Sequence, residues 1–223
     1  MAAAAPASAG SFMVTPVRIT LSASQSVTPI TVRNESQETT VVQVDLVAWT
    51  QRDGADVYTA TREILATPPI FTLKPGASQI VRIGLRRDAD PARELAYRVF
   101  LQEVPPPPKA EFKGLRVALR MGIPVFVLPP AAVAPQLQWR AQAMREGGLS
   151  LSLRNDGNAH IQVMEVRLAH PAEREIAAER TPVYVLPGQS QGWRMKGSAP
   201  SGATVRLRAR TDGADVDADL KVE

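Results

Sequence analysis

The sequence predicts an all-β protein with two sandwich domains. Three observations lead to this fold class: many short segments rich in Val, Ile and Leu, turn residues between them, and a proline-rich break past the middle of the chain. The 223 residues are enough for two domains of about 100 residues each. Many short strands with regularly spaced turn signals are typical of sandwiches and barrels.

The expected strands are apolar segments bounded by Gly, Pro, Asn and Asp. Alternation is clear in residues 42–48, where Val, Leu and Ala are interleaved with Gln and Asp. This period of two is typical of a strand with one buried face. The main segments are residues 12–21, 30–32, 41–49, 80–85, 97–104 and 115–128.

A segment rich in Pro and Ala, residues 128–135, separates two blocks of expected strands. We therefore expect a first domain at residues 11–130 and a second at residues 131–223. Residues 1–10 are small and uncharged, which predicts a flexible tail and does not fit an intact signal peptide. The tail either follows a removed signal or is a plain disordered terminus.

Two short motifs occur twice in the same order. The strand that ends in Arg33-Asn34 is echoed by Arg154-Asn155, and the turn Pro75-Gly76 is echoed by Pro187-Gly188. Two echoes in one order favour duplicated domains of one fold. The alternative is that both pairs reflect common turn chemistry.

Composition argues against several classes of function. The net charge of +4 is spread along the chain, so we expect no nucleic-acid partner, and no apolar run reaches the roughly 18 residues of a membrane span. Cysteine is absent, and the two histidines, His160 and His170, are expected at the surface. No catalytic or phosphate-binding motif occurs, so we expect neither an enzyme nor a metal or other cofactor.

Acidic residues alternate near the end of the chain, at Asp215, Asp217 and Asp219. A calcium site would need such oxygens on a loop that curls around the ion. Alternation instead favours one solvent-exposed face of a last strand.

The segment 115–123 has the most regular alternation in the chain. One parity is apolar and the other consists of Arg, Ala and Gly, so a strand here has one apolar face. Taken alone, this face either covers the domain's own core or is available to a partner. The apolar residues are Leu115, Val117, Leu119, Met121 and Ile123.

Several short motifs follow one another along the first domain. They are Pro16-Val17-Arg18, Val32-Arg33-Asn34, Pro68-Pro69, Pro75-Gly76, Val81-Arg82, Arg93-Glu94, Glu103-Val104-Pro105 and, after the alternating strand, Pro124-Val125-Phe126. In this order they resemble the PapD-like chaperones of the chaperone–usher pathway, and most closely the archaic branch. The resemblance runs from about residue 12 to the linker and continues more weakly to the end.

The resemblance implies two immunoglobulin-like domains set at an angle with a cleft between them. It also implies a periplasmic protein that binds pilus subunits by donor-strand complementation and delivers them to an outer-membrane usher. The apolar residues of 115–123 would then form the donor strand. Arg18 matches the arginine that grips the subunit's terminal carboxylate. Pro124 stands where the family has a second, cationic anchor, and Arg120 is the candidate replacement.

Three further charged residues, Arg82, Glu94 and Asp212, match positions that the family uses for a salt-bridge network between its domains. Their expected role is structural, since mutually paired buried charges fix orientation more than they add stability.

Two other functions stay open. One is a two-domain structural or adhesive module of a surface assembly, whose 115–123 face would lie in its own core. The other is a sugar-binding or carbohydrate-active protein, in which Trp49, Trp139 and Trp193 would stack on sugars, although their strand settings favour packing.

Overall fold

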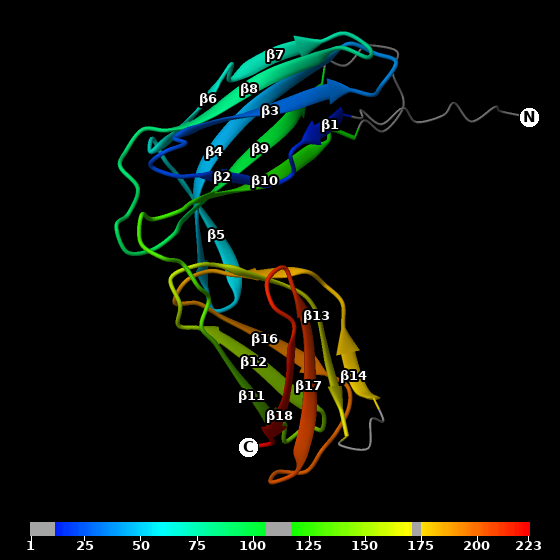
Figure 1. The fold of residues 1–223 in the computed structure, drawn as a ribbon. Coiled ribbons are helices and arrows are strands. Elements are labelled where there is room, and N and C mark those ends of the chain that lie inside the picture. Colours follow the sequence, from blue (N-terminus) through cyan, green and yellow to red (C-terminus); the bar gives the residue numbers. More distant parts are fainter. Residues whose placement is uncertain (1–11, 106–116, 171–174) are drawn as a thin grey trace, which may run out of the picture. The chain divides into compact units, whose positions relative to one another are not determined.

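The computed structural model describes residues 12–105, 117–170 and 175–223. Every regular element among them is a β-strand, and the strands belong to two compact units (Figure 1). The predicted all-β class with two sandwich domains is confirmed. In the part of the chain that the structure describes, no helix has the length and apolar character needed to cross a membrane.

The first unit is a sandwich of two sheets (Figure 1). One sheet has the antiparallel order β1-β3-β8-β6, and the other has the order β2-β10-β9-β4-β5, with β7 also paired to β4. Within the second sheet β2 runs parallel to β10. The strands are β1 (Phe12–Thr15), β2 (Ile19–Leu21), β3 (Val27–Asn34), β4 (Thr40–Arg52), β5 (Ala55–Ala60), β6 (Ile64–Thr67), β7 (Ile70–Leu73), β8 (Ser78–Leu85), β9 (Leu95–Val104) and β10 (Arg120–Val127).

The second unit is also a sandwich. Its sheets have the orders β11-β12-β16 and β14-β13-β17-β18, with β15 paired to β13. The strands are β11 (Leu137–Ala143), β12 (Leu149–Asn155), β13 (Ile161–Ala169), β14 (Glu175–Glu179), β15 (Val183–Val185), β16 (Ser190–Met195), β17 (Thr204–Thr211) and β18 (Val216–Lys221).

Each unit encloses its own apolar core, built from the inward parity of its strands. In β3 the buried residues Ile30 and Val32 alternate with exposed neighbours, and in β12 the same holds for Leu151 and Leu153 with partly exposed ones. The alternation read from the sequence therefore selects the buried face, because successive side chains of a strand point to opposite sides.

The first expected strand, residues 12–21, is two strands in the structure. β1 joins one sheet and β2 the other. Pro16 has no N–H to continue a ladder, so pairing stops between them. The chain consequently contributes an edge strand to both sheets of the first unit.

The units do not divide the chain at a single point. The first contains residues up to Trp49, Tyr58–Ala89 and Leu95–Leu128, whereas the second takes Thr50–Val57, Asp90–Glu94 and everything from Pro129. Hydrogen bonds explain the first exception: the Gln51 side chain donates to Tyr184 O (2.8 Å) and accepts from Leu186 N (2.9 Å). The expected domains 11–130 and 131–223 did not include these two insertions.

Candidate functional site

β10 has one edge that its neighbour β2 covers only in part. β9 pairs with all of Arg120–Val127 on one side, whereas β2 on the other side pairs only with Val125–Val127. Among the residues that the structure describes, no strand pairs with this second edge from Arg120 to Pro124. β10 therefore presents a short open edge, which is a place where a further strand can bind.

The backbone groups on this open edge follow from hydrogen bonds at its two ends. Leu119 O accepts a bond from β9 (2.9 Å), whereas Leu128 N donates to β2 (2.8 Å). Odd-numbered residues thus direct their backbone groups toward β9, and even-numbered residues direct theirs toward the open edge. Arg120 and Gly122 offer both N–H and C=O there, but Pro124 offers a carbonyl alone because proline has no N–H.

The predicted apolar donor face changes character along the segment. Val117 is 58% exposed, and Leu119 and Met121 are partly buried against the core of the first unit. Ile123 is 1% exposed and is part of that core, which differs from the expectation. Ile123 lies two residues before the first residue of β10 that pairs with β2, so the core covers this face of the strand before its edge is paired. Leu115 lies outside the described residues.

Arg18 lies immediately before β2, where the open edge ends. The register pairs Ile19 with Val125, which puts Arg18 level with Pro124. The Arg18 residue is exposed. A strand added to the edge in the direction of β10 would therefore bring its C-terminal carboxylate to Arg18, and a guanidinium can bind a carboxylate through two parallel hydrogen bonds.

Arg120, the expected second anchor, lies at the opposite end of the open edge. Its Cζ atom is 4.0 Å from the centroid of the Phe100 ring. Arg120 and Pro124 are four residues apart on β10, which corresponds to about 13 Å along the strand at about 3.3 Å per residue. Arg120 projects from the same outward face as Arg18, because cross-strand neighbours share a face, but it is stacked on a ring away from the Arg18 level.

Another basic residue is nearer to Pro124 in register, and the sequence analysis did not single it out. Arg98 of β9 is paired with Pro124, and its Cζ atom lies 4.0 Å from the centroid of the Trp49 ring. The signal in the sequence was the parity of β9, where Tyr97 and Val99 are buried and Arg98 must face outward.

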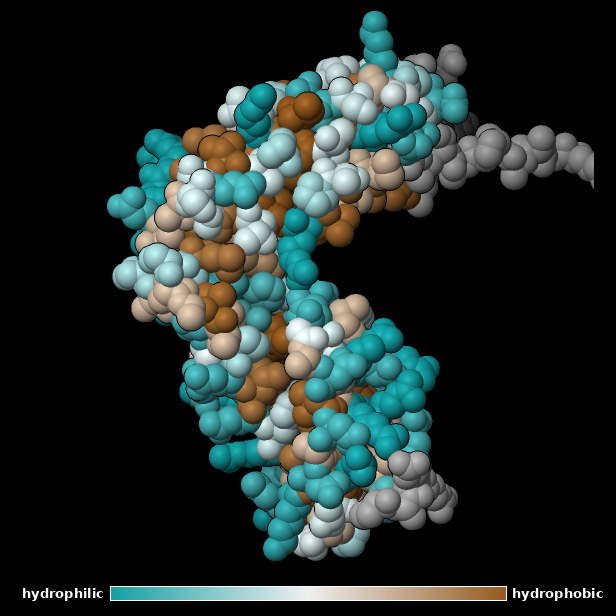
Figure 2. Space-filling model, viewed as in Figure 1, coloured by the Kyte–Doolittle hydropathy of each residue, from teal (hydrophilic) through white to brown (hydrophobic). Residues whose placement is uncertain are grey.

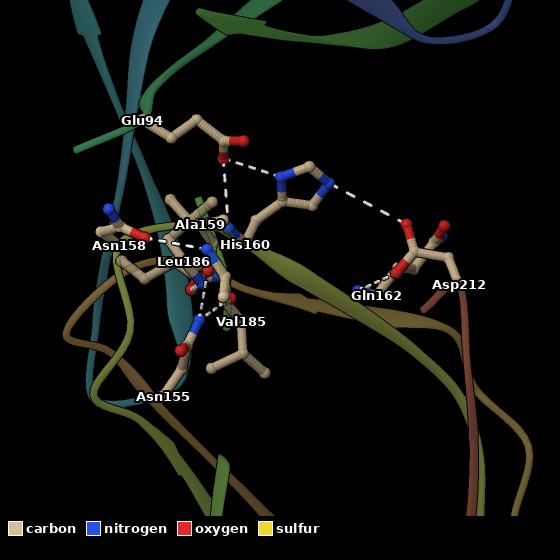
Figure 3. Close-up of polar contacts among 11 residues, drawn as sticks. Glu94, Asn155, Asn158, Ala159, His160, Gln162, Val185, Leu186 and Asp212 are labelled. Atoms are coloured by element: carbon tan, nitrogen blue, oxygen red, sulfur yellow. Dashed lines mark hydrogen bonds and ion pairs between the residues drawn. The ribbon is translucent and has the colours of Figure 1, made fainter. Parts of the chain in front are cut away.

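His160, expected at the surface, is largely buried, with 14% of its side chain exposed. Its Nδ1 atom lies 2.7 Å from Glu94 Oε1, and its backbone N–H donates to the same oxygen (3.2 Å; Figure 3). Its Nε2 atom lies 3.9 Å from Asp212 Oδ2. His160 therefore bridges two carboxylates within the second unit, and Glu94 belongs to the connection between β8 and β9.

The expected trio of Arg82, Glu94 and Asp212 is divided between the units. Arg82 is an exposed residue of β8 in the first unit, whereas Glu94 and Asp212 belong to the second, where His160 joins them. The Val81-Arg82 motif by itself does not show which face of the strand its arginine occupies. Because Val81 and Ile83 are buried, Arg82 faces outward.

The tryptophan rings pack against other side chains of the protein and are not presented to solvent as a binding surface. Trp49 is 2% exposed and Trp193 is 7% exposed, and Trp139 stacks on Trp193 with ring centroids 5.7 Å apart. Buried rings offer no platform for a sugar, so this packing argues against the sugar-binding alternative.

Comparison with known proteins decides the family. Residues 11–133 match the family described as pili and flagellar-assembly chaperone, PapD N-terminal domain. The chain belongs to this family. This PapD-type chain is 37% identical over 94 residues to the chaperone protein FaeE of Escherichia coli, a match that covers 42% of the chain and 33% of FaeE. It is 30% identical over 119 residues to the uncharacterized fimbrial chaperone YcbF of E. coli K12, covering 49% of the chain and 50% of YcbF. The chain thus spans a third to a half of the length of these relatives.

Solved structures share the fold of the PapD-type chain over nearly its whole length. A chain of the CsuC–CsuE chaperone–tip adhesion subunit complex, from the archaic chaperone–usher Csu pili of Acinetobacter baumannii, has a TM-score of 0.72 at 18% identity and covers 96% of this chain and 99% of its own. The E. coli chaperone DraB has a TM-score of 0.67 at 21% identity, with 97% and 99% covered. A chain of the Salmonella enterica complex of SafA pilin with the SafB chaperone has a TM-score of 0.66 at 19% identity, with 96% and 97% covered.

Proposed function

We propose that this PapD-type chain is a periplasmic chaperone that binds pilus subunits by donating β10 and then delivers them to an outer-membrane usher. The observation that carries the proposal is the open edge of β10, which ends at Arg18. Beside it lie three apolar side chains that the unit's own core does not fully cover, those of Val117, Leu119 and Met121. The binding consists of backbone pairing and apolar burial, so we propose no cofactor.

The physical reason for such a partner is a missing strand. An incomplete sandwich exposes unpaired backbone groups and part of its core, and both invite aggregation. An added strand covers both at once. Leu119 and Met121 are already partly buried, so the burial added by binding is worth less than the roughly 5–9 kcal/mol of burying three fully exposed apolar side chains, and the cost of association is subtracted from it.

The similar proteins support this choice of partner. FaeE is a chaperone protein and YcbF a fimbrial chaperone. The CsuC and SafB structures hold a tip adhesion subunit and a pilin, and CsuC comes from a chaperone–usher system. The usher of the present chain is inferred from the chaperone–usher system of CsuC, and its periplasmic location from another similar structure, that of the periplasmic chaperone SfaE.

The test is capture of a subunit. The full chain, carrying an affinity tag, is co-expressed with the pilus subunits of its own organism, and the bound subunit is identified by mass spectrometry. We expect Arg18→Ala to keep the melting temperature and to weaken capture by about 2–5 kcal/mol, as for removal of one partner of a buried charge pair. Arg33→Ala, an exposed arginine of β3, is the matched control. Equal capture by both variants would contradict the role of Arg18.

A second candidate is a structural or adhesive module that uses this segment for its own core. The burial of Ile123 favours it. Under that function no subunit is captured, and charges placed anywhere on the apolar parity of 117–123 destabilise the first unit.

A further inference from the structure

The two sheets of the second unit differ in the charges that their strands carry. β11, β12 and β16, which form the three-stranded sheet (Figure 1), contain no acidic residue, and their charged residues are Arg140, Arg154 and Arg194. The strands of the other sheet, β13, β14, β17 and β18, contain acidic and basic residues in equal number. Positive charge without negative charge is therefore a property of one sheet.

The outer face of the three-stranded sheet, which we call the arginine face, consists of the even-numbered residues of its strands. The odd-numbered residues Leu151 and Trp193 are buried in the core, so their even-numbered neighbours point away from it. No side chain of this face is acidic or apolar, and all are exposed or partly exposed. The face is made of Gln138, Arg140, Gln142, Ser150, Ser152, Arg154, Ser190, Gly192 and Arg194.

Two arginines of this face have no carboxylate partner. Arg140 and Arg194 are exposed, and neither forms an ion pair in the part of the chain that the structure describes. On the other sheet, Arg206 binds Asp217 through two hydrogen bonds (2.6 and 3.0 Å), and Arg208 lies 3.6 Å from the same carboxylate. The protein thus neutralises arginines on one sheet and leaves two on the other available to an anionic partner.

Gly192 lies at the centre of β16, where the fold does not require glycine. Its φ is outside the left-handed region, and an added Cβ would meet nothing closer than Leu151 O, at 3.9 Å. Glycine weakens a strand relative to alanine, and within a strand it often marks a place where a ligand approaches closely. Its cross-strand partner is Ser152, whose hydroxyl makes no hydrogen bond to the described residues. An anionic oxygen can therefore reach this hydroxyl over Gly192.

The composition of the arginine face indicates the class of partner. Protein interfaces have an apolar core, which this face does not offer. Arg154 is already paired with Asp156, whereas Arg140 and Arg194 stand on the outer strands, whose backbones are about 10 Å apart on either side of β12. Cations spread over an open sheet match a plane of anionic groups. Arginine binds phosphate through parallel hydrogen bonds, which suits the phosphate layer of a lipid membrane.

We propose that the arginine face docks the protein on an anionic membrane surface by binding lipid phosphate groups. The contact is electrostatic and reversible, so salt weakens it. It stays in the headgroup layer, because the face has no apolar side chain to insert. This contact goes beyond the proposed function and does not depend on it, since the face belongs to the second unit and the donor edge to the first.

Co-sedimentation of the full chain with lipid vesicles tests the proposal. We expect binding to vesicles that contain phosphatidylglycerol and none to vesicles of phosphatidylcholine alone. Arg140→Gln and Arg194→Gln should each weaken binding about fivefold, as for the loss of one cation near an anionic surface, and the double variant about 25-fold. Arg208→Gln is the matched control, because it changes the net charge equally on the other sheet. An equal loss in this control would overturn the proposal, because the attraction would then follow net charge alone.

Gly192→Gln separates docking from folding. The position has room for a side chain, so we expect an unchanged or higher melting temperature, with a loss of vesicle binding about as large as that from removal of one arginine. Full vesicle binding by this variant would contradict the assignment of the face.

Two further probes distinguish the membrane from other sources of negative charge. Inorganic phosphate should weaken vesicle binding no more than sodium chloride of equal ionic strength. Binding of inorganic phosphate or of polyglutamate, without binding to anionic vesicles, would overturn the membrane as partner. Absence of vesicle binding would do so while leaving the proposed function standing, because subunit capture tests that function separately.

Discussion

Tyr97, buried in β9, supports a charge pair at the rim of the first unit. Its hydroxyl donates to Glu63 Oε2 (2.6 Å), and Arg87 Nη1 lies 2.6 Å from Glu63 Oε1. The hydrogen bond from Tyr97, helped by Arg87, lowers the pKa of the Glu63 carboxyl. Burial, followed by the bond to Glu63, raises the pKa of Tyr97. The carboxylate is thus stabilised by folding in its charged form.

Tyr97→Phe is expected to lower the free energy of unfolding at pH 7 by about 1–2 kcal/mol. This is less than the roughly 1.5–3 kcal/mol of a hydrogen bond to a charged group, because the Glu63 side chain is partly exposed to solvent. The pKa of Glu63 is lower in the folded state, so its contribution is present above its usual pKa of 4.5 and is lost as the pH falls below it. Urea unfolding of both proteins between pH 7 and pH 3 measures this. The difference between the two proteins should shrink as the pH falls, and a difference that grows toward low pH would contradict the assignment.

At the scale of the element, the odd-numbered residues of β10 and of the segment just before it face one side, and this side is exposed at one end and buried at the other. Val117, just before the strand, is more than half exposed, while Ile123 near its middle is buried in the core. The change lies between Met121, which is partly buried, and Ile123, before β2 begins to pair at Val125. One end of the segment is therefore available to a partner, and the other holds the sandwich together.

A matched pair of substitutions follows from this division. Val117→Asp places a charge in water and is expected to leave the melting temperature within a few degrees of the parent while abolishing subunit capture. Ile123→Asp buries an unpaired carboxylate and should cost more than about 4 kcal/mol, enough to unfold the first unit. Thermal unfolding followed by circular dichroism and the same capture assay are the measurements. Unfolding by both variants would favour the structural-module alternative.

Across the whole molecule, the two units repeat one turn arrangement. Asn34 is fully buried and its Nδ2 donates to Glu38 O and Leu73 O, while its backbone carbonyl accepts from Gly76 N (3.0 Å). Asn155 is fully buried in the same way: its Nδ2 donates to Ala159 O and Val185 O, and its backbone carbonyl accepts from Gly188 N (2.8 Å). Gly76 and Gly188 have φ of 72° and 75°, which glycine adopts without strain. In each unit the Arg-Asn motif and the Pro-Gly turn are therefore joined by the same hydrogen bond, as expected for duplicated domains of one fold.

Asn34→Ala and Asn155→Ala are therefore expected to have equal effects in different units. Each removes a buried amide and leaves its backbone partners unsatisfied, which should cost about 3 kcal/mol. Hydrogen exchange read by mass spectrometry should show increased exchange in β3 and β7 for the first variant and in β12 and β15 for the second. An effect of either variant that is confined to the other unit would contradict this account.

The units differ in the surface that they present. Among the residues that the structure describes, the exposed large apolar side chains lie in the first unit, with the exception of Val133. Three of them, Val27, Leu65 and Ile80, lie on the outer face of one sheet. Figure 2 shows brown, apolar surface mixed with teal over the unit that holds β3, β6 and β8. Contact with other proteins is therefore expected to concentrate on the first unit.

The amino-acid sequence by itself determined the β-rich fold class, the two-domain length, the parity of the strands and the motifs that the family match later explained. These features depend on neighbouring residues, and alternation or a Pro-Gly turn is visible in a few letters. The exposed aspartates of β18 and the packed tryptophans followed from parity and setting in the same way.

Features that depend on which strands become neighbours were decided by the tertiary structure alone. The sequence could not show that β2 pairs with β10 only from Val125 onward, which leaves the edge from Arg120 to Pro124 open, or that the core covers Ile123 but not Val117. It also could not show that His160, in a turn-like stretch, would lie against Glu94, which is 66 residues away in the chain. Pairing between distant segments is set by the packing of whole sheets, because a one-residue shift of register moves every side chain to the other face. The open edge and the His160 bridge therefore appear only once the strands are assembled.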